Sequence, residues 1–432
     1  MTLRTLDALV KHYPDLPREA ILKTDLLRLG VAFTPAALCR CASAKPKSYF
    51  IFSFDRKSQK ELSPEERHCA PEEIALIGGP WDCQRTIVSV RLNPDSPYRI
   101  DAVDEHPLTL QCDGTPLCTI ELPTFPAYYA RPLANGKPVT DIAPTLEWGY
   151  LIYLTTFRLC QYWGREEECQ YCDINENYRQ QRAEGRSYTG VKTPEDVCEA
   201  LAIINELDVE RQSRTYTVTG GSITTQLQGL SEGAFYARYA EAIESRFPGR
   251  WIGKAVVQAL SRDEARRLRT AGYQIYHPNF EVWDPVLFDR ICPGKARHVG
   301  REEWIRRIMD AAEFFRPTHV IPNFVAGVEM AKPHGFTTID QALQSTGAGL
   351  DWFMARGILP RFTVWCVEPN TTLARTNPEP PPLAYFAGLL QRYCETFHRY
   401  GLPLPPGYGP TGRGRAVFSV SAFMDVLPES GA

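Results

Sequence analysis

The stretch Cys160-Gln-Tyr-Trp-Gly-Arg-Glu-Glu-Glu-Cys169-Gln-Tyr-Cys172 places three cysteines at the spacing C-x8-C-x2-C. It follows the apolar run Trp148–Phe157, which predicts a strand that ends in this loop. Such a loop can point three thiols at one spot, where they bind a metal ion or an iron–sulfur cluster. A closed structural zinc site needs four ligands, whereas a 4Fe–4S cluster on three thiolates keeps one iron open. The presence of only three cysteines in this loop favours an iron–sulfur cluster. A structural zinc site that takes its fourth ligand from a distant part of the chain remains an alternative.

Length and composition indicate two domains. The chain has 432 residues, and a hydrophobic fraction of 44% is ample for packed cores. A net charge of -3, from 48 basic and 51 acidic residues, favours neither nucleic acid nor an anionic membrane as a partner. The N-terminus lacks a signal-peptide pattern and no run of about 18 apolar residues occurs, so we expect a soluble, cytoplasmic protein. In that reducing compartment most of the 13 cysteines should be buried free thiols.

Residues 1–145 are expected to form a smaller α+β N-terminal domain. Residues 1–45 show apolar positions at helical spacing, interrupted by Pro14 and Pro17. Aromatic and β-branched residues then predict strands at Ser48–Phe54, Thr86–Leu92, Leu108–Cys112 and Leu117–Leu122. Six cysteines of this region could hold a second metal site, but their irregular spacing favours isolated thiols: Cys39, Cys41, Cys69, Cys83, Cys112 and Cys118. Residues 125–142, rich in Pro, read as a connecting arm.

From residue 146 to residue 400, strands and helices alternate, which predicts a parallel sheet with helices packed outside it. The predicted strands are Tyr150–Thr156, Tyr216–Thr219, Gly253–Gln258, Gln274–Val282, His319–Gly327 and Arg361–Val367. The predicted helices are Pro194–Glu206, Glu232–Arg246, Arg262–Ala271, Arg301–Phe315, Ile339–Arg356 and Pro382–Tyr400. Six such units are too few for an eight-stranded barrel and predict a partial (β/α)6 TIM-like barrel. Residues 401–432 read as an extended C-terminal tail.

Two strand ends carry residues suited to binding a ligand. Gly220 and Gly221, followed by Ser222, end the second strand, where glycines let the backbone approach a ligand closely. Asn279 and Glu281 are two residues apart on the predicted fourth strand, so we expect their side chains to share a face. Two polar groups on an otherwise apolar face need partners or a ligand.

In this order the motifs resemble the radical S-adenosylmethionine (SAM) superfamily. Tyr171 precedes the last cysteine as an aromatic residue does in that family, and Gly220-Gly221-Ser222 is similar to its Gly-Gly-Glu motif with Ser in place of Glu. Asn279 and Glu281 are similar to its Asn-x-Asp or Asn-x-Glu strand. The first cysteine gap departs from the family, whose commonest spacing is C-x3-C-x2-C.

The resemblance implies a 4Fe–4S cluster on Cys160, Cys169 and Cys172, with SAM on the fourth iron. It assigns contacts with SAM to Tyr171, Gly220, Gly221, Ser222, Asn279 and Glu281. The activity implied is reductive cleavage of SAM to a 5′-deoxyadenosyl radical that acts on a small-molecule substrate, with flavodoxin or ferredoxin as the reducing partner. Residues that contact the substrate are not identified.

Two alternatives stay open at the level of sequence. One is a zinc-stabilised α/β protein in which the cysteine triad and one histidine are structural. The other is a scaffold that keeps the cluster and cleaves no SAM. Cys292 is interpreted as packing at a helix end, and Arg158, next to the cysteine loop, either tunes the cluster or neutralises residues 166–168.

Overall fold

Strands from the first 121 residues form a six-stranded sheet in the order β1-β4-β5-β6-β2-β3. β1 and β4 are parallel and the remaining neighbours are antiparallel. The strands are β1 (Ala32–Phe33), β2 (Glu73–Gly78), β3 (Cys83–Ser89), β4 (Tyr98–Asp101), β5 (Leu108–Cys112) and β6 (Thr115–Glu121). The helices are α1 (Thr2–His12), α2 (Arg18–Leu29), α3 (Pro35–Cys41) and α4 (Pro64–Cys69). β5 has its predicted bounds, β3 begins and ends three residues early, and the sequence patterns missed β2 and β4.

The computed structural model describes residues 2–48, 54–183, 185 and 190–430. The predicted strand Ser48–Phe54 therefore lies, apart from its two end residues, outside the described residues. The connecting arm contains two short helices, η1 (Ala127–Ala130) and α5 (Val139–Ile142).

The second half of the chain contains parallel strands, as predicted. β8 (Leu151–Phe157), β9 (Thr215–Gly220), β10 (Ile252–Val257) and β11 (Ile275–Pro278) pair in parallel in chain order. The short β7 (Thr145–Leu146) joins β8 as an antiparallel edge. β12 (Asn323–Ala326) and β13 (Arg361–Val364) form a separate parallel pair. Parallel bridges from Tyr276 to Val320 and from Glu281 to Phe324 connect the two sheets.

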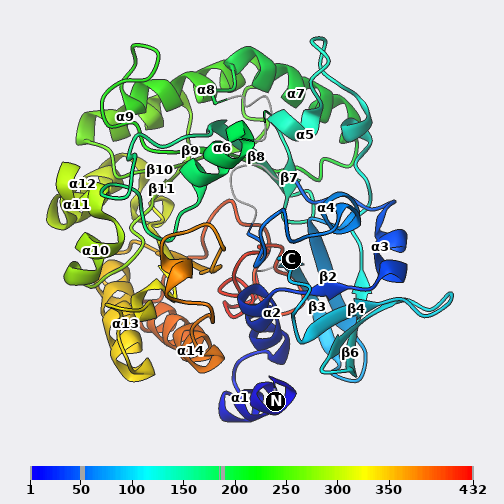
Figure 1. Ribbon diagram of the computed structural model, residues 1–432. Coiled ribbons are helices and arrows are strands. Elements are labelled where there is room, and N and C mark those ends of the chain that lie inside the picture. The colour runs from blue at the N-terminus through cyan, green and yellow to red at the C-terminus, as the bar shows by residue number, and fades with distance from the viewer. Residues whose placement is uncertain (1, 49–53, 184, 186–189, 431–432) are drawn as a thin grey trace.

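The helices of this half, apart from the first, follow one another in chain order around the outside of these strands (Figure 1). They are α6 (Ile174–Ala183), α7 (Pro194–Leu207), α8 (Glu232–Arg246), α9 (Arg262–Ala271), α10 (Pro285–Ile291), α11 (Pro293–His298), α12 (Arg301–Phe315), α13 (Ile339–Met354) and α14 (Leu383–Tyr400), with 3-10 turns at η2 (Pro317–His319), η3 (Val328–Met330) and η4 (Leu373–Arg375). α8, α9 and α12 have their predicted bounds. Thr193 caps α7, because its side chain accepts from the Asp196 N–H.

Three strands are shorter than predicted, and one of them matters for the site. β11 ends at Pro278, four residues before the predicted end, because the chain turns there from β10 toward β12. The N–H of Asn279 still bonds to Val257, but the N–H groups of Phe280 and Glu281 both bond to the Asn323 carbonyl. Asn279 and Glu281 therefore follow the strand, and the expectation that strand periodicity gives them one face is wrong.

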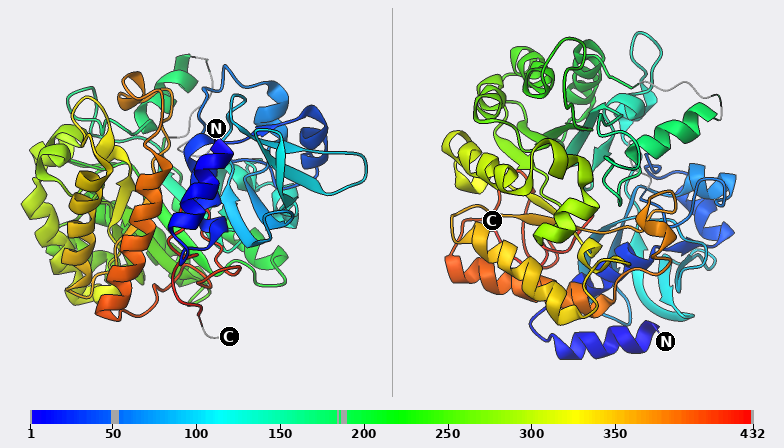
Figure 2. Two further views of the ribbon diagram at one scale, coloured as in Figure 1. Left: turned by 90° about the horizontal axis from the view of Figure 1, so that it is seen from below. Right: turned by 60° about the vertical axis from the view of Figure 1, so that its left-hand side comes forward.

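The C-terminal tail lies between the barrel strands and the N-terminal sheet (Figure 2). Its carbonyl at Gly407 accepts from Lys254 Nζ on β10 at 2.8 Å, and its Asp425 pairs with Lys23 of α2 at 2.8 Å. Both charged partners of the second pair are buried. The tail is thus irregular, as predicted, but it packs against both halves of the chain.

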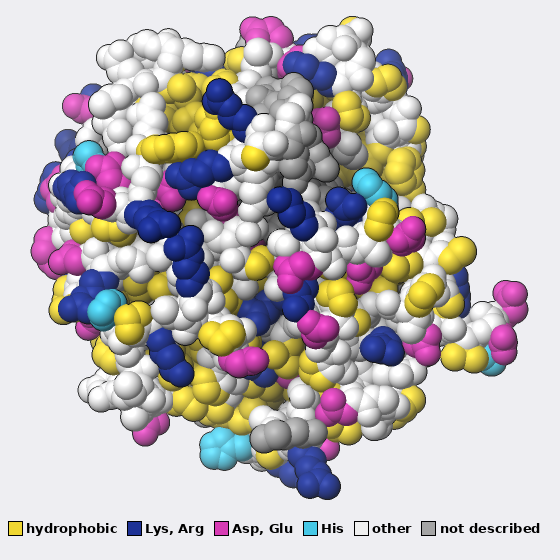
Figure 3. Space-filling model, in the orientation of Figure 1, with side chains coloured by type: hydrophobic (Ala, Val, Ile, Leu, Met, Phe, Trp, Pro, Cys, Tyr) yellow, Lys and Arg dark blue, Asp and Glu magenta, His cyan; other side chains and the backbone are white. Residues whose placement is uncertain are grey.

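Charges of both signs are intermixed on the face shown in Figure 3, in line with the net charge of -3. Among the described residues, no helix combines the length and the apolar character needed to cross a membrane.

Candidate functional site

A cavity of about 210 Å³ opens at the end of the parallel strands where the cysteine loop leaves β8. All nine residues that the sequence singles out as metal or cofactor ligands line it: Cys160, Tyr171, Cys169, Cys172, Gly220, Gly221, Ser222, Asn279 and Glu281. The carboxyl ends of parallel strands are where α/β proteins bind ligands, because the loops that follow the strands converge there.

The cysteine loop is tied to the first helix that follows it. The side-chain carbonyl of Asn175 accepts from the Cys160 N–H at 2.9 Å, and its amide donates to the carbonyls of Cys160 at 3.2 Å and of Tyr162 at 2.9 Å. The same amide donates to Glu168 Oε1 at 3.1 Å. Asn175 is 1% exposed, so these bonds are shielded from water. The Asn175 side chain therefore holds both ends of the eight-residue segment between Cys160 and Cys169.

Two other elements hold the loop from the opposite side. The Ser222 carbonyl after β9 accepts from the Gln161 N–H at 2.9 Å. At the junction of α10 and α11, the Ile291 carbonyl accepts from Gln170 N–H at 2.8 Å, and Gly294 N–H donates to the Glu167 carbonyl at 3.1 Å. A long first gap is thus accommodated because the extra residues pack against this junction.

Gly220 and Gly221 are needed where β9 meets the cysteine loop. A Cβ at Gly221 would lie 1.9 Å from the Leu159 carbonyl oxygen, and a Cβ at Gly220 would lie 2.5 Å from that of Phe157. The Gly221 carbonyl accepts from the Tyr236 hydroxyl at 2.8 Å. The glycines therefore let the loop approach the strand end, a packing role that the sequence interpretation, which assigned them to a ligand, did not include.

The three thiols differ in their surroundings. Burial raises the pKa of Cys160 to about 12 and holds that of Cys172 well above its usual range. A hydrogen bond from the Cys292 thiol, together with the Lys295 ammonium, lowers the pKa of Cys169 despite burial. Cys292 is at the junction of α10 and α11 and is fully buried, so its packing position is as interpreted, with a polar contact added.

Within the described ranges, no three His, Cys, Asp or Glu side chains converge on a single metal ion. In a 4Fe–4S cluster the thiolates bind different irons, so they need to face one cavity rather than one point. A fourth cysteine, Cys366, also lines the hollow, but its thiol donates to the Phe54 carbonyl at 3.2 Å. The three thiols of the cysteine loop therefore form a donor set that fits such a cluster.

Glu281 has a partner that the sequence analysis missed. Its Oε1 lies 2.5 Å from Lys295 Nζ, and both side chains are about 6% exposed. Burial opposes the charge of Lys295, but the Glu281 carboxylate and the nearby Cys169 and Cys292 together outweigh burial and raise the pKa of Lys295. Lys295 also donates to the Asn279 carbonyl at 3.1 Å. Glu281 itself has a φ of 80°, a left-handed conformation that residues with a side chain seldom adopt outside functional sites.

Four side chains that line the cavity have buried polar atoms without a hydrogen-bond partner. They are Asn279 Oδ1, Asn323 Oδ1, Arg361 Nε and Trp365 Nε1. An unsatisfied buried polar group costs about 1–3 kcal/mol, so a cluster of them at one hollow points to a ligand that satisfies them. Of the four, only Asn279 was among the ligands expected from the sequence.

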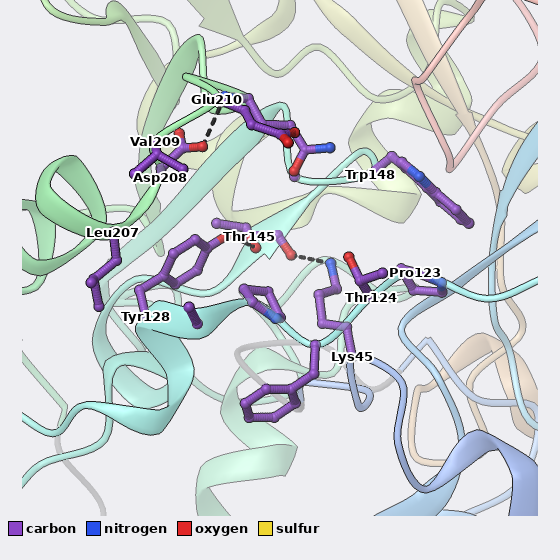
Figure 4. A pocket seen from close by; sticks show the side chains of 15 residues that line it. Lys45, Pro123, Thr124, Tyr128, Thr145, Trp148, Leu207, Asp208, Val209 and Glu210 are labelled. Carbon is purple, nitrogen blue, oxygen red and sulfur yellow. Dashed lines mark hydrogen bonds between the residues drawn. The ribbon is translucent and has the colours of Figure 1, made fainter.

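A second hollow, of about 250 Å³, lies beside the connecting arm and the loop after α7 (Figure 4). Its buried Lys45 donates to the Thr145 carbonyl at 2.5 Å, and its Tyr128 hydroxyl lies 3.1 Å from Thr145 Oγ1. Asp208 accepts from the Gln212 N–H at 2.8 Å. None of its described lining residues has a buried polar atom without a partner, in contrast to the barrel cavity.

Sequence reasoning missed five residues of the site: Lys295, Asn175, Asn323, Arg361 and Trp365. Lys295 lies three residues after Cys292, which the sequence analysis interpreted as packing at a helix end. Asn175 and Arg361 carry no motif, because their roles depend on which strand or loop the fold places opposite them.

Comparisons with known proteins find distant structural neighbours. No family model matches the chain, and no curated protein matches its sequence. The FeFe-hydrogenase maturase HydG from Carboxydothermus hydrogenoformans aligns at 13% identity over 58% of this chain and 52% of its own, with a TM-score of 0.39. Methylornithine synthase (PylB) aligns at 11% identity over 59% of this chain and 72% of its own, with a TM-score of 0.38.

Coproporphyrinogen III oxidase (HemN) from Escherichia coli, a radical SAM enzyme, aligns at 14% identity over 60% of this chain and 52% of its own, with a TM-score of 0.34. The alignments with HydG and HemN span about half of the length of those proteins.

Proposed function

We propose that the protein is a radical SAM enzyme with a six-unit partial barrel, in which Cys160, Cys169 and Cys172 hold a 4Fe–4S cluster. The observation that carries this proposal is the cavity itself. Three thiols from one loop face it, together with Gly220, Gly221 and two unsatisfied asparagine side chains, those of Asn279 and Asn323. Three thiolates leave one iron open for a ligand, which a closed zinc site does not.

The residues that line the cavity would bind either the cluster or SAM, according to their side-chain chemistry. Cys160, Cys169 and Cys172 would supply the thiolates, and Asn175 would keep their loop in place. Asn279, with an unsatisfied oxygen, would accept a hydrogen bond from SAM. Tyr171, Ser222 and Glu281 line the same cavity and complete the cofactor contacts that the resemblance implies.

When bound, the cluster and SAM would supply a 5′-deoxyadenosyl radical after one-electron reduction by a partner such as flavodoxin or ferredoxin. The chain's part is to position a small-molecule substrate against SAM and to keep water out. Buried apolar and aromatic side chains around the cavity, Val325, Val364 and Trp365 among them, serve that exclusion.

Anaerobic reconstitution with iron and sulfide tests the proposal. We expect a brown protein with broad absorption near 400 nm that forms 5′-deoxyadenosine from SAM in the presence of dithionite. A colourless protein that binds zinc would establish the structural-zinc alternative. A brown protein that forms no 5′-deoxyadenosine would establish a cluster-binding scaffold.

The variant Asn279→Ala tests the cofactor contact. Since its Oδ1 has no partner in the protein, removing it should leave the stability of the apo-protein unchanged or slightly higher. SAM affinity, measured by calorimetry on the reconstituted protein, should fall by about five- to thirtyfold, as expected for one lost hydrogen bond of roughly 1–2 kcal/mol. Unchanged affinity would remove Asn279 from the cofactor site.

A further inference from the structure

At the base of the barrel cavity, Arg361 and Asn323 are register partners on the parallel strands β13 and β12. Both line the cavity, so their side chains lie next to each other on its wall. Nε of Arg361 and Oδ1 of Asn323 are buried and have no hydrogen-bond partner. A donor and an acceptor side by side, both unsatisfied, are costly unless a ligand bonds to them.

The Arg361 guanidinium is held by aromatic groups of the C-terminal tail. Its Cζ lies 5.7 Å from the ring centre of Tyr408 and 5.6 Å from that of Phe418. The Tyr408 hydroxyl is also hydrogen-bonded to the Arg361 side chain. Aromatic faces orient a guanidinium without neutralising its charge, so the group stays available to an anion.

The carboxylates that line the cavity have other partners, because Glu281 pairs with Lys295 and Glu368 accepts from the Phe54 N–H at 2.8 Å. Among the described side chains, no carboxylate forms an ion pair with Arg361. Lys254 is a second cation, bonded to the Gly407 carbonyl. Burial and the cations Arg361 and Lys254 hold the pKa of His277 well below its usual range, so that imidazole is neutral. The Glu147 carboxyl interacts with both cations, and burial raises its pKa to about 7.

We propose that the base of this cavity binds the carboxylate of a small acidic substrate, with Arg361 donating to its oxygens and Asn323 Oδ1 accepting from a neighbouring N–H or O–H of the same substrate. This inference rests on the proposed function, because it names the substrate class of the same site. Arginine presents two parallel donors that match a carboxylate, which makes such a pair both strong and specific. One guanidinium with one amide suits a carboxylate better than a phosphate, whose three oxygens call for more donors.

The position of Arg361 separates this site from the cofactor. Arg361 begins β13, so it lies about 10 Å below the end of that strand at Val364, at a rise of about 3.3 Å per residue. The cysteines enter at the strand ends above. A substrate anchored at Arg361 would extend upward past Thr363 and Val325, which are also register partners on the cavity wall, toward the thiols.

A panel of carboxylic acids of three to eight carbon atoms, each paired with its neutral amide, tests the proposal. Binding to the reconstituted protein with SAM present would be detected by saturation-transfer NMR, and affinities of the ligands found would be measured by calorimetry. We expect acids and not their amides to bind. Arg361→Gln should weaken the acids at least tenfold, and Arg361→Lys less, because the charge is kept and the paired donors are lost. Arg356→Gln, on an exposed arginine at the end of α13, is the matched control.

Four results would overturn the proposal. A carboxylate site would be excluded if acids and amides bound equally, or if Arg361→Gln left the affinity for the acids unchanged. It would also be excluded if no acid of the panel bound, or if glycerol phosphate alone bound. A loss of SAM binding in Arg361→Gln would assign the guanidinium to the cofactor instead. Failure of the proposed function would be distinct, because the wild-type protein would then load no cluster and bind no SAM.

Discussion

The side-chain amide of Asn175 is hydrogen-bonded to both the N–H and the carbonyl of Cys160, at 2.9 and 3.2 Å. A side chain outside the cysteine motif therefore sets the backbone of its first cysteine. The Arg179 side chain supports the same arrangement, because it forms an ion pair with Glu168, another partner of Asn175.

The variant Asn175→Asp should loosen the loop. Aspartate keeps the acceptor for Cys160 N–H but loses the donors to the carbonyls of Cys160 and Tyr162, and it places a carboxylate against Glu168. Each buried carbonyl left unsatisfied costs about 1–3 kcal/mol, so we expect a lower melting temperature and several-fold less iron after reconstitution. Gln180→Glu, the same change of amide to carboxylate on α6, should retain normal loading. Full loading and unchanged melting in Asn175→Asp would show that the loop does not depend on this side chain.

Removal of any one thiol of the triad should abolish cluster loading. Cys160→Ala, Cys169→Ala and Cys172→Ala each take away one of three ligands, whereas Cys39→Ala, Cys41→Ala and Cys198→Ala leave the cavity untouched. Iron and acid-labile sulfide per chain are the measurement. Cys292→Ala should also load the cluster. The Cys292 thiol bonds to Cys169, but it does not line the cavity and so is not a ligand. Normal iron content in Cys160→Ala would mean that the spacing C-x8-C-x2-C names the wrong first ligand.

The buried pair of Glu281 and Lys295 should behave as a unit. Glu281→Gln leaves the Lys295 ammonium buried without a counter-charge, which should lower the free energy of unfolding of the apo-protein by roughly 3–5 kcal/mol. The double variant Glu281→Gln with Lys295→Met should recover most of that loss, since no charge remains. Urea denaturation of the two single variants and the double variant measures the coupling between them.

The exposed ion pair of Arg262 and Glu313 supplies the control for the variants of Glu281 and Lys295. Glu313→Gln should change stability little, because both partners are in contact with water. If Glu281→Gln were equally harmless, the ion pair would not hold this wall of the cavity together.

Glu232 should make stability depend on pH. Burial raises the pKa of this carboxyl to about 8, above its value of about 4.3 in an unfolded chain. Because the pKa of Glu232 is raised, its neutral carboxyl stabilises the folded state at low pH. This contribution to the free energy of unfolding is lost as the pH rises from about 4.5 through 8. Glu232→Gln stays neutral, so at pH 9 it should be more stable than the wild type by on the order of 3 kcal/mol, and at pH 5 similar.

Free energies of unfolding of the apo-protein at pH 5, 7 and 9 check this expectation. Glu241→Gln, at an exposed carboxyl on the same helix, should follow the wild-type dependence. A constant difference between Glu232→Gln and the wild type over the whole range would mean that Glu232 does not titrate with folding.

The sequence alone determined the elements and the chemistry of the site. Alternating strand and helix patterns give parallel strands, and the bounds of α8, α9 and α12 agree to the residue, because helix ends are set by local caps and breakers. The cysteine spacing and the glycines after β9 indicated where a ligand would lie, since residues at strand ends meet at one edge of a parallel sheet.

Tertiary structure decided the partners. Nothing in the local pattern shows that β11 stops at Pro278, that Lys295 meets Glu281, or that Arg361 lies beside Asn323. These contacts join segments 14 to 44 residues apart, and they depend on register and on the course of the chain between strands. Sequence periodicity reports which side of an element is buried, whereas the identity of the group across from it is fixed only when the whole chain is folded.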